Sequence, residues 1–171
     1  MAIEIERKFI CSPLILAELF QPHVIFTAQK IVQGLITDEP MTRIRLTEQL
    51  VDTPKCEKGR KTAYLTVKGK PAGASRNEYE DQIGTSMATE LLAFVCRQPL
   101  TVKTRFCLQD SYGKYWDVDI YHGENAGLIV GEIQLSSNDE KFQLPCWALR
   151  EVTEDPEYSN TNLAQNRVSH A

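Results

Sequence analysis

Residues 100–121 read LTVKTRFCLQDSYGKYWDVDIY, and this stretch indicates the fold of the whole chain. Residues 100–108 and 114–121 are rich in β-branched and aromatic residues, many of which alternate with polar ones. The turn-forming sequence DSYG at 110–113 separates them. A period of two residues broken by such a turn is typical of a β-hairpin. The stretch therefore predicts two antiparallel strands.

The same period recurs along most of the chain. Further strands are expected at 2–10, 41–47, 62–69, 76–83, 128–135 and 24–37, of which the last could form one long strand or two. Helix-starting signals occur at Ser12-Pro13, Thr85-Ser86 and Tyr158-Ser159. Many strands joined mostly by short turns predict a mainly β (α+β) fold, in which an antiparallel sheet curls or closes and few helices lie outside.

Composition sets limits on the class of protein. The chain has 171 residues, of which 42% are hydrophobic and 25% charged, as expected for one soluble domain covering residues 1–171. No apolar run of about 18 residues occurs, so no transmembrane helix and no membrane partner are expected. A net charge of −4 argues against general nucleic-acid binding. Scattered cysteines, without a CxxC pair or a signal peptide, indicate reduced thiols in the cytoplasm.

Charged residues occur in pairs separated by one residue, so both side chains of a pair point to the same face of a strand. Each pair carries one sign: Arg43 and Arg45, Lys103 and Arg105, Glu4 and Glu6, Glu78 and Glu80, Asp117 and Asp119. The pattern fits a charged outer face over an apolar interior, or a polar tunnel with apolar residues outside. Segregation of the signs by strand favours a site for a polyanion together with cations. Arg and Lys hold phosphate oxygens, whereas carboxylates hold Mg²⁺ or Mn²⁺.

These segments resemble the CYTH family, the triphosphate tunnel metalloenzymes. The resemblance starts at the ExExK motif in EIERKF (4–9) and continues in order through QGL (33–35), RIR (43–45), LTVK (65–68), RNEYE (76–80), KTRF (103–106), DVD (117–119), GEIQL (131–135) and EVTED (151–155). It covers almost the whole chain. It implies an eight-stranded antiparallel barrel, closed around a charged tunnel, with a few flanking helices.

The resemblance also implies roles for individual residues. The triphosphate would bind Lys8, Arg43, Arg45, Lys68, Lys103 and Arg105. The metal, Mg²⁺ or Mn²⁺, would be held mainly by Glu4, Glu6 and Glu132, with Glu78, Glu80, Asp117 and Asp119 as further candidates. Catalytic roles would fall to Glu4 and Glu6 for metal and water positioning, to Lys103 with Arg105 for transition-state charge, and to Lys68 for proton handling.

The resemblance implies metal-dependent hydrolysis of inorganic tripolyphosphate to pyrophosphate and phosphate. A class IV adenylate cyclase, which forms cyclic AMP from ATP, and a nucleotide or thiamine triphosphatase are alternatives on the same scaffold. One departure concerns Gln134, which follows Glu132 where many members have a second acid. An amide binds a divalent ion less well than a carboxylate, so a non-catalytic polyphosphate- or nucleotide-binding module is a further alternative. The expected partner is a small molecule containing a triphosphate, and a homodimer stays open.

Overall fold

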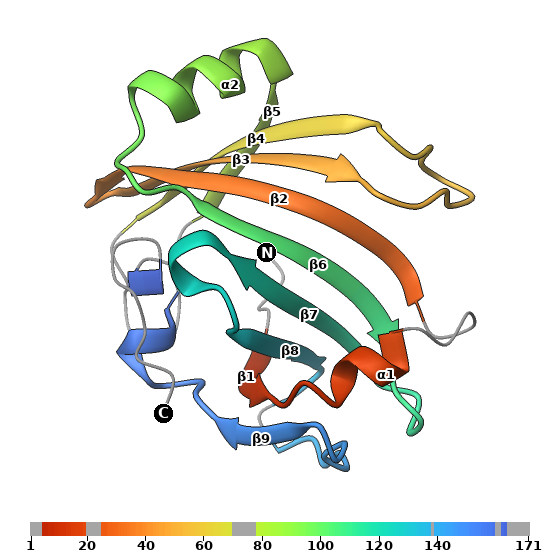
Figure 1. Ribbon diagram of the computed structural model, residues 1–171. Coiled ribbons are helices and arrows are strands. Elements are labelled where there is room, and N and C mark those ends of the chain that lie inside the picture. The colour runs from red at the N-terminus through yellow and green to blue at the C-terminus, as the bar shows by residue number, and fades with distance from the viewer. Residues whose placement is uncertain (1–4, 20–24, 70–77, 138, 160–161, 164–171) are drawn as a thin grey trace.

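Nine antiparallel strands form one curved sheet in the computed structural model, which describes residues 5–19, 25–69, 78–137, 139–159 and 162–163 (Figure 1). The strands are β1 (Ile5–Cys11), β2 (Ile25–Asp38), β3 (Met41–Gln49), β4 (Lys61–Lys68), β5 (Glu78–Ile83), β6 (Thr101–Gln109), β7 (Tyr115–His122), β8 (Ile129–Leu135) and β9 (Ala148–Glu151). Their order in the sheet is β5-β4-β3-β2-β6-β7-β8-β1-β9. The mainly β prediction is confirmed: residues 100–121 form the β6–β7 hairpin, and residues 24–37 give the single strand β2.

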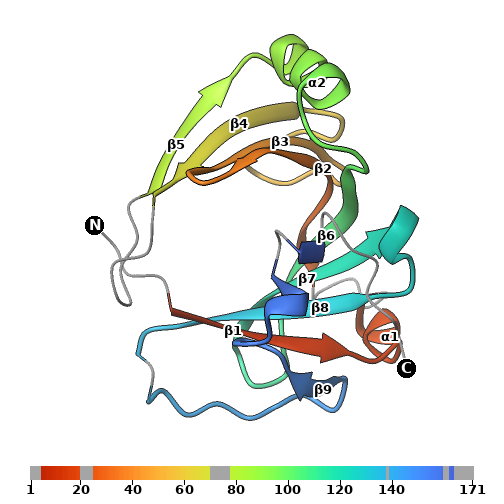
Figure 2. The same ribbon diagram turned by 90° about the vertical axis from the view of Figure 1, so that its left-hand side faces the viewer.

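The predicted closed eight-stranded barrel is wrong for the part of the chain that the structure describes. There the sheet has two edges, β5 and β9. A barrel made of the eight predicted strands would need β1 to pair with β5. However, β1 pairs with β8 on one side and, at Phe9, Ile10 and Cys11, with β9 on the other, and no pairing of β1 with β5 occurs among the described residues. The sheet therefore curls into a trough, in which an upper arm (β3, β4 and β5) faces a lower arm (β7, β8, β1 and β9) (Figure 2).

Two helices cover the convex face of the sheet, as predicted. The helix α2 (Thr85–Phe94) packs Ala88 and Leu92 against Ile44 and Ala63 of the upper arm. The helix α1 (Ile15–Leu19) packs on the lower arm. A 3-10 turn, η2 (Pro156–Tyr158), directly precedes the third predicted helix, of which residues 162–163 are helical and most of the rest lies outside the described residues. Another 3-10 turn, η1 (Gly123–Asn125), precedes β8. No helix in the described residues has the length and apolar character needed to cross a membrane.

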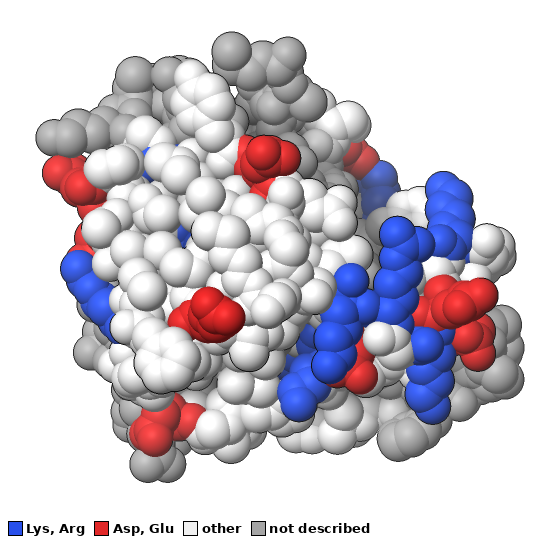
Figure 3. All heavy atoms as spheres, turned by 90° about the horizontal axis from the view of Figure 1, so that it is seen from above, with Lys and Arg blue, Asp and Glu red and all other residues white. Residues whose placement is uncertain are grey.

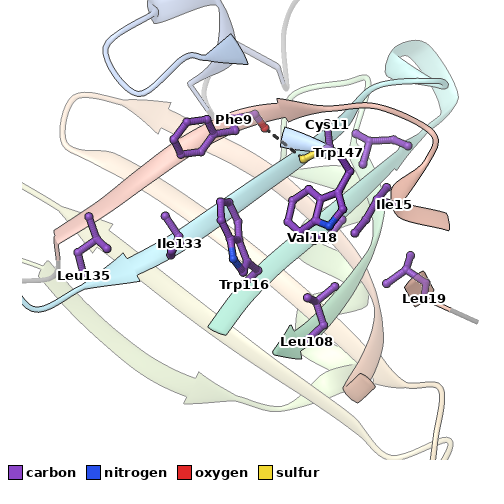
Figure 4. Packing of buried hydrophobic residues seen from close by; sticks show 11 residues of the cluster. Phe9, Cys11, Ile15, Leu19, Leu108, Trp116, Val118, Ile133, Leu135 and Trp147 are labelled. Atoms are coloured by element: carbon purple, nitrogen blue, oxygen red, sulfur yellow. Dashed lines mark hydrogen bonds between the residues drawn. The ribbon is translucent and has the colours of Figure 1, made fainter. Parts of the chain in front are cut away.

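The convex face of the lower arm holds the larger apolar cluster. Phe9, Trp116 and Ile133 pack there with Ile15 of α1, and Trp147 lies edge-on to Trp116 with ring centroids 4.9 Å apart (Figure 4). Because side chains alternate along a strand, the neighbours of these apolar residues point to the concave face. The structure thus has a polar interior with apolar residues outside, which is the second of the two architectures that the charge pairs allow.

The C-terminal segment lies at one end of the trough. Val152, Tyr158 and Leu163 pack against Tyr121 and Val130 of the lower arm. Figure 2 shows this segment, including η2, between the two arms. It therefore forms a wall of the trough at the end where β1 and β4 approach it.

Candidate active site

Charged side chains from β6, β7, β8 and β1 meet on the concave face because of the pairing register of these strands. The register sets Arg105 opposite Asp119, Asp117 opposite Glu132, and Glu132 opposite Lys8. The period of two then places all of these side chains on one face of the sheet. The predicted charge pairs of these strands are therefore brought together at one place.

Asp119 is the centre of this group and is fully buried. Its Oδ2 accepts a hydrogen bond from Lys103 Nζ at 2.5 Å, and Arg105 binds both carboxylate oxygens at 2.7 Å. Burial alone would raise the pKa of Asp119, but the charges of Lys103 and Arg105 outweigh it and lower the pKa to about 2. Asp119 is therefore ionised at neutral pH and holds two of the predicted phosphate-binding cations in fixed positions.

Arg105 extends the network to two further carboxylates. Its Nη1 donates to Asp117 Oδ2 at 3.0 Å, and its Nη2 donates to Glu132 Oε2 at 2.9 Å. Lys8 Nζ lies 3.0 Å from the other oxygen of Glu132. Burial would raise the pKa of Glu132, but Arg105 and Lys8 lower it. Buried charges are tolerated when they are paired in this way.

Lys103 is shielded from solvent by its partners. Its side chain is buried, and its ammonium group lies 5.4 Å from the centre of the Tyr121 ring. Burial lowers the pKa of Lys103, although Asp119 opposes this effect. The structure therefore places Lys103 behind Asp119 and Arg105, at the floor of the trough.

The upper arm carries the remaining predicted cations, and their surroundings differ. Arg43 Nη2 donates to Thr66 Oγ1 at 3.4 Å, and this hydroxyl donates to Glu80 Oε2 at 2.7 Å. Among the residues that the structure describes, the Nε atom of Arg45 is buried without a hydrogen-bond partner. Burial, together with the nearby charge of Arg105, lowers the pKa of Arg45. An arginine in such surroundings is suited to an incoming anion.

Two neutral residues that sequence reasoning assigned no role lie beside Arg45. The register places Gln33 of β2 between Arg45 of β3 and Thr101 of β6. Both Gln33 and Thr101 are buried, and in the described residues Gln33 Oε1 and Thr101 Oγ1 lack hydrogen-bond partners. A buried polar atom without a partner costs about 1–3 kcal/mol, so this row indicates a place for a polar ligand or water. This row follows from the pairing register of β2 with β3 and β6. Neither Gln33 nor Thr101 reveals that register in the sequence.

Three predicted phosphate-binding cations meet at a cavity of about 270 Å³. Lys8 comes from the lower arm, and Arg43 and Lys68 come from the upper arm. The C-terminal segment closes the cavity with residues between Thr153 and Ser159. The cavity therefore draws positive side chains from both arms of the sheet.

The convex surface offers a contrast. Seen from above α2, it is largely uncharged, and most of the Lys and Arg side chains in view gather on one side (Figure 3). The loop between β3 and β4 carries exposed basic residues, namely Lys55, Lys58 and Arg60. The cations that the resemblance assigns to the phosphate lie instead on the concave face.

Of the predicted metal ligands, Glu6 has surroundings that best suit a cation. Burial and the negative charge of Glu132 raise the pKa of Glu6, so a cation at this point would relieve the repulsion. Gln134 Nε2 donates to Glu6 Oε2 at 3.3 Å, which shows that the amide contacts the acid directly. Carboxylate oxygens are the ligands that Mg²⁺ and Mn²⁺ prefer, so the donor chemistry fits.

The other predicted metal ligands differ in what the structure shows. Glu4 lies outside the described residues, and only the strand position of Glu78 is described. Asp117 and Asp119 are engaged by Arg105, and Glu80 by Thr66. Within the described ranges, no three acidic, His or Cys side chains are grouped closely enough to hold a metal.

The curved sheet and its charged concave face define a protein of the triphosphate tunnel class. No protein-family model matches the chain. An inorganic triphosphatase of Nitrosomonas europaea is 30% identical over 164 residues, covering 94% of this chain and 96% of that protein. An inorganic triphosphatase of Acetivibrio thermocellus is 46% identical over 103 residues, and this match spans 60% of the chain and 65% of that protein. A crystal structure of the inorganic triphosphatase NE1496 superposes with a TM-score of 0.66 at 26% identity, covering 97% of each chain.

The chain therefore belongs to the inorganic triphosphatases, hydrolases of the CYTH-like triphosphate tunnel family.

Proposed function

We propose that this protein hydrolyses inorganic tripolyphosphate to pyrophosphate and phosphate in the trough. The relatives from Nitrosomonas europaea and Acetivibrio thermocellus are both named inorganic triphosphatases. The observation in the structure that carries the proposal is the convergence of cations from both arms on one polar concave face, where the Nε of Arg45 lacks a partner in the described residues. A linear polyanion supplies the acceptor oxygens that this face needs.

Binding would fall first to the cations that line or approach the cavity. Arg43, Arg45 and Lys68 on the upper arm would hold phosphate oxygens from one side, and Lys8 from the other. Arg45 would bind directly, because its Nε is buried without a hydrogen-bond partner among the described residues. Lys68, which is half-buried at the cavity, would be placed to exchange a proton with the substrate.

Lys103 and Arg105 would act from positions that are fixed before the substrate arrives. Asp119 holds both side chains, so no reorganisation is needed when negative charge develops on the phosphate. Lys103 is buried behind the network, and we infer that it acts through Asp119 and Arg105 as a positioning residue. Arg105, which is partly exposed, would face the substrate.

Glu6 and Glu132, together with Glu4, would hold Mg²⁺ or Mn²⁺. When bound, the divalent ion neutralises phosphate charge and polarises the phosphorus–oxygen bonds. Glu6, which is more exposed than Glu132, would orient the attacking water. At position 134, whose side chain contacts Glu6, this protein has an amide where many family members have a carboxylate.

The test is the initial rate of phosphate release from tripolyphosphate, with Mg²⁺ and Mn²⁺ titrated separately. We expect metal-dependent turnover, and Glu6→Gln should raise the metal concentration needed for half-maximal rate more than it raises the KM for tripolyphosphate. The exposed Glu157→Gln serves as the matched control. Cyclic AMP formation from ATP that is faster than tripolyphosphate hydrolysis would contradict the proposal, as would tight tripolyphosphate binding without turnover.

A further inference from the structure

A second cavity adjoins the basic one, and the two share part of the C-terminal segment as a wall. The basic cavity contains Lys8, Arg43 and Lys68. The second cavity, of about 500 Å³, is lined by Glu6, Arg7, Glu151 and neighbouring residues. Thr153, Glu154 and Asp155 line both cavities. Glu154 therefore lies at the boundary between a positive and an acidic compartment.

Most charges of the second cavity are already engaged. Arg7 forms an ion pair with Glu151, so these two charges offset each other. Asp155 Oδ1 accepts from the backbone N–H of Glu157 at the start of η2, and Asp155 Oδ2 lies 3.5 Å from Arg150 Nη1. Glu154, whose side chain is exposed, thus supplies negative charge that an anion would meet there, whereas Glu6 is a proposed metal ligand.

We propose that Glu154 sets an upper limit on the length of phosphate chain that the trough accepts, an inference that rests on the proposed function. A triphosphate lies among the cations of the basic cavity. A longer linear polyphosphate that extends past this wall carries its additional negative charge toward Glu154. Like charges repel, and salt screens this repulsion little at low ionic strength. The longer chain therefore binds less well under those conditions.

A metal-binding role for Glu154 is the competing explanation. In the described part of the chain, no group of three acidic, His or Cys side chains has the spacing of a metal site. Asp155, the neighbour of Glu154, is occupied as the cap of η2. The metal requirement of the Glu154 variants therefore distinguishes the two roles.

The experiment compares kcat/KM for tripolyphosphate and for linear tetrapolyphosphate from initial rates, and the dissociation constants of both anions by calorimetry without metal. The variants are Glu154→Gln and Glu154→Lys. The control is Glu157→Gln, which removes an exposed carboxylate of the same segment that lines neither cavity.

We expect the ratio of tetrapolyphosphate to tripolyphosphate kcat/KM to rise about threefold in Glu154→Gln and further in Glu154→Lys, as one charge at about 7 Å in water predicts. The ratio of the tetrapolyphosphate to the tripolyphosphate dissociation constant should fall correspondingly, because tetrapolyphosphate then binds more tightly. The changes in the kcat/KM ratio and in the ratio of dissociation constants should both shrink in about 0.5 M salt, where charges are screened within a few ångströms. The control Glu157→Gln should match the wild type.

Unchanged ratios in both Glu154 variants would overturn the inference. So would a raised metal requirement in Glu154→Gln with an unchanged ratio, because that result would make Glu154 a metal ligand. If the wild type hydrolyses neither anion, the proposed function fails, while the calorimetric ratios still decide the role of Glu154.

Discussion

Asp119 is the residue on which the charge balance of the trough depends. It is fully buried, and two basic side chains bind its carboxylate at 2.5–2.7 Å. Without it, Lys103 would be a buried cation that has lost its carboxylate partner, and Arg105 would keep only Asp117 and Glu132. Asp119 therefore contributes to stability as well as to the geometry of the site.

The lowered pKa of Asp119 predicts a dependence of stability on acid pH. Because its folded pKa is about 2 and its ordinary value is 3.8, the folded state binds the proton less well than the unfolded state. The stabilisation is thus complete above about pH 5 and is lost as the pH falls toward 2, by an amount on the order of 2 kcal/mol. Urea unfolding at several pH values measures it.

Asp119→Asn should lower the free energy of unfolding at pH 7 by about 3–5 kcal/mol and should flatten this acid dependence. The exposed Asp81→Asn provides the control, with a wild-type profile expected. Parallel profiles for the wild type and Asp119→Asn would show that Asp119 does not carry the effect.

The charge pairs show how far single residues could be predicted. Their alternation identified the concave side chains Lys103, Arg105, Asp117 and Asp119. The sequence did not reveal that the acidic pair binds the basic pair directly. That outcome depends on the register of β6 with β7, which sets Arg105 opposite Asp119 and is fixed by the packing of the whole sheet.

At the level of elements, β2 is positioned by a close approach at Gly34. A Cβ atom at this position would lie 2.6 Å from Cys96 Cβ and 2.7 Å from Leu100 Cδ2. The chain between α2 and β6 therefore packs directly on the backbone of β2. This contact fixes the strand that carries Gln33 between Arg45 and Thr101.

Gly34→Ala should destabilise the fold by about 1–3 kcal/mol, because the added methyl group displaces residues 96–100. For a chain of this length that corresponds to a fall in Tm of about 3–10 °C, measurable by calorimetry. Gly84→Ser is the control, since a Cβ at position 84 meets no atom within 4 Å. Equal Tm values for Gly34→Ala and the wild type would mean that the approach is not tight.

Strands with a clear period of two were predictable, and β9 was not. Its four residues, Ala148–Glu151, are half-buried or exposed, so they show no alternation. Yet β9 pairs with Phe9, Ile10 and Cys11 of β1 and forms one edge of the described sheet. A short edge strand can thus be added to a sheet without leaving a signal in the hydrophobic pattern.

At the scale of the molecule, the sheet, its two covering helices and the C-terminal segment produce one polar concave face. The apolar clusters under α1 and α2 stabilise the arms from outside, so the inner side chains are free to be charged. The C-terminal segment closes one end between Lys8 and Lys68. Substrate binding should therefore depend on the concave cations and not on the basic loop between β3 and β4.

The most direct test of this account is a calorimetric titration of tripolyphosphate, with wild type, Arg45→Ala and Arg60→Ala compared at one salt concentration. Arg45→Ala should weaken binding at least about tenfold, the loss expected for a hydrogen bond to a charged group. Its free energy of unfolding should be no lower than that of the wild type, because the substitution removes a buried cation whose Nε has no partner in the described residues. Arg60→Ala, on the exposed β3–β4 loop, should bind like the wild type. Equal affinity in Arg45→Ala, or a loss confined to Arg60→Ala, would contradict a substrate site on the concave face.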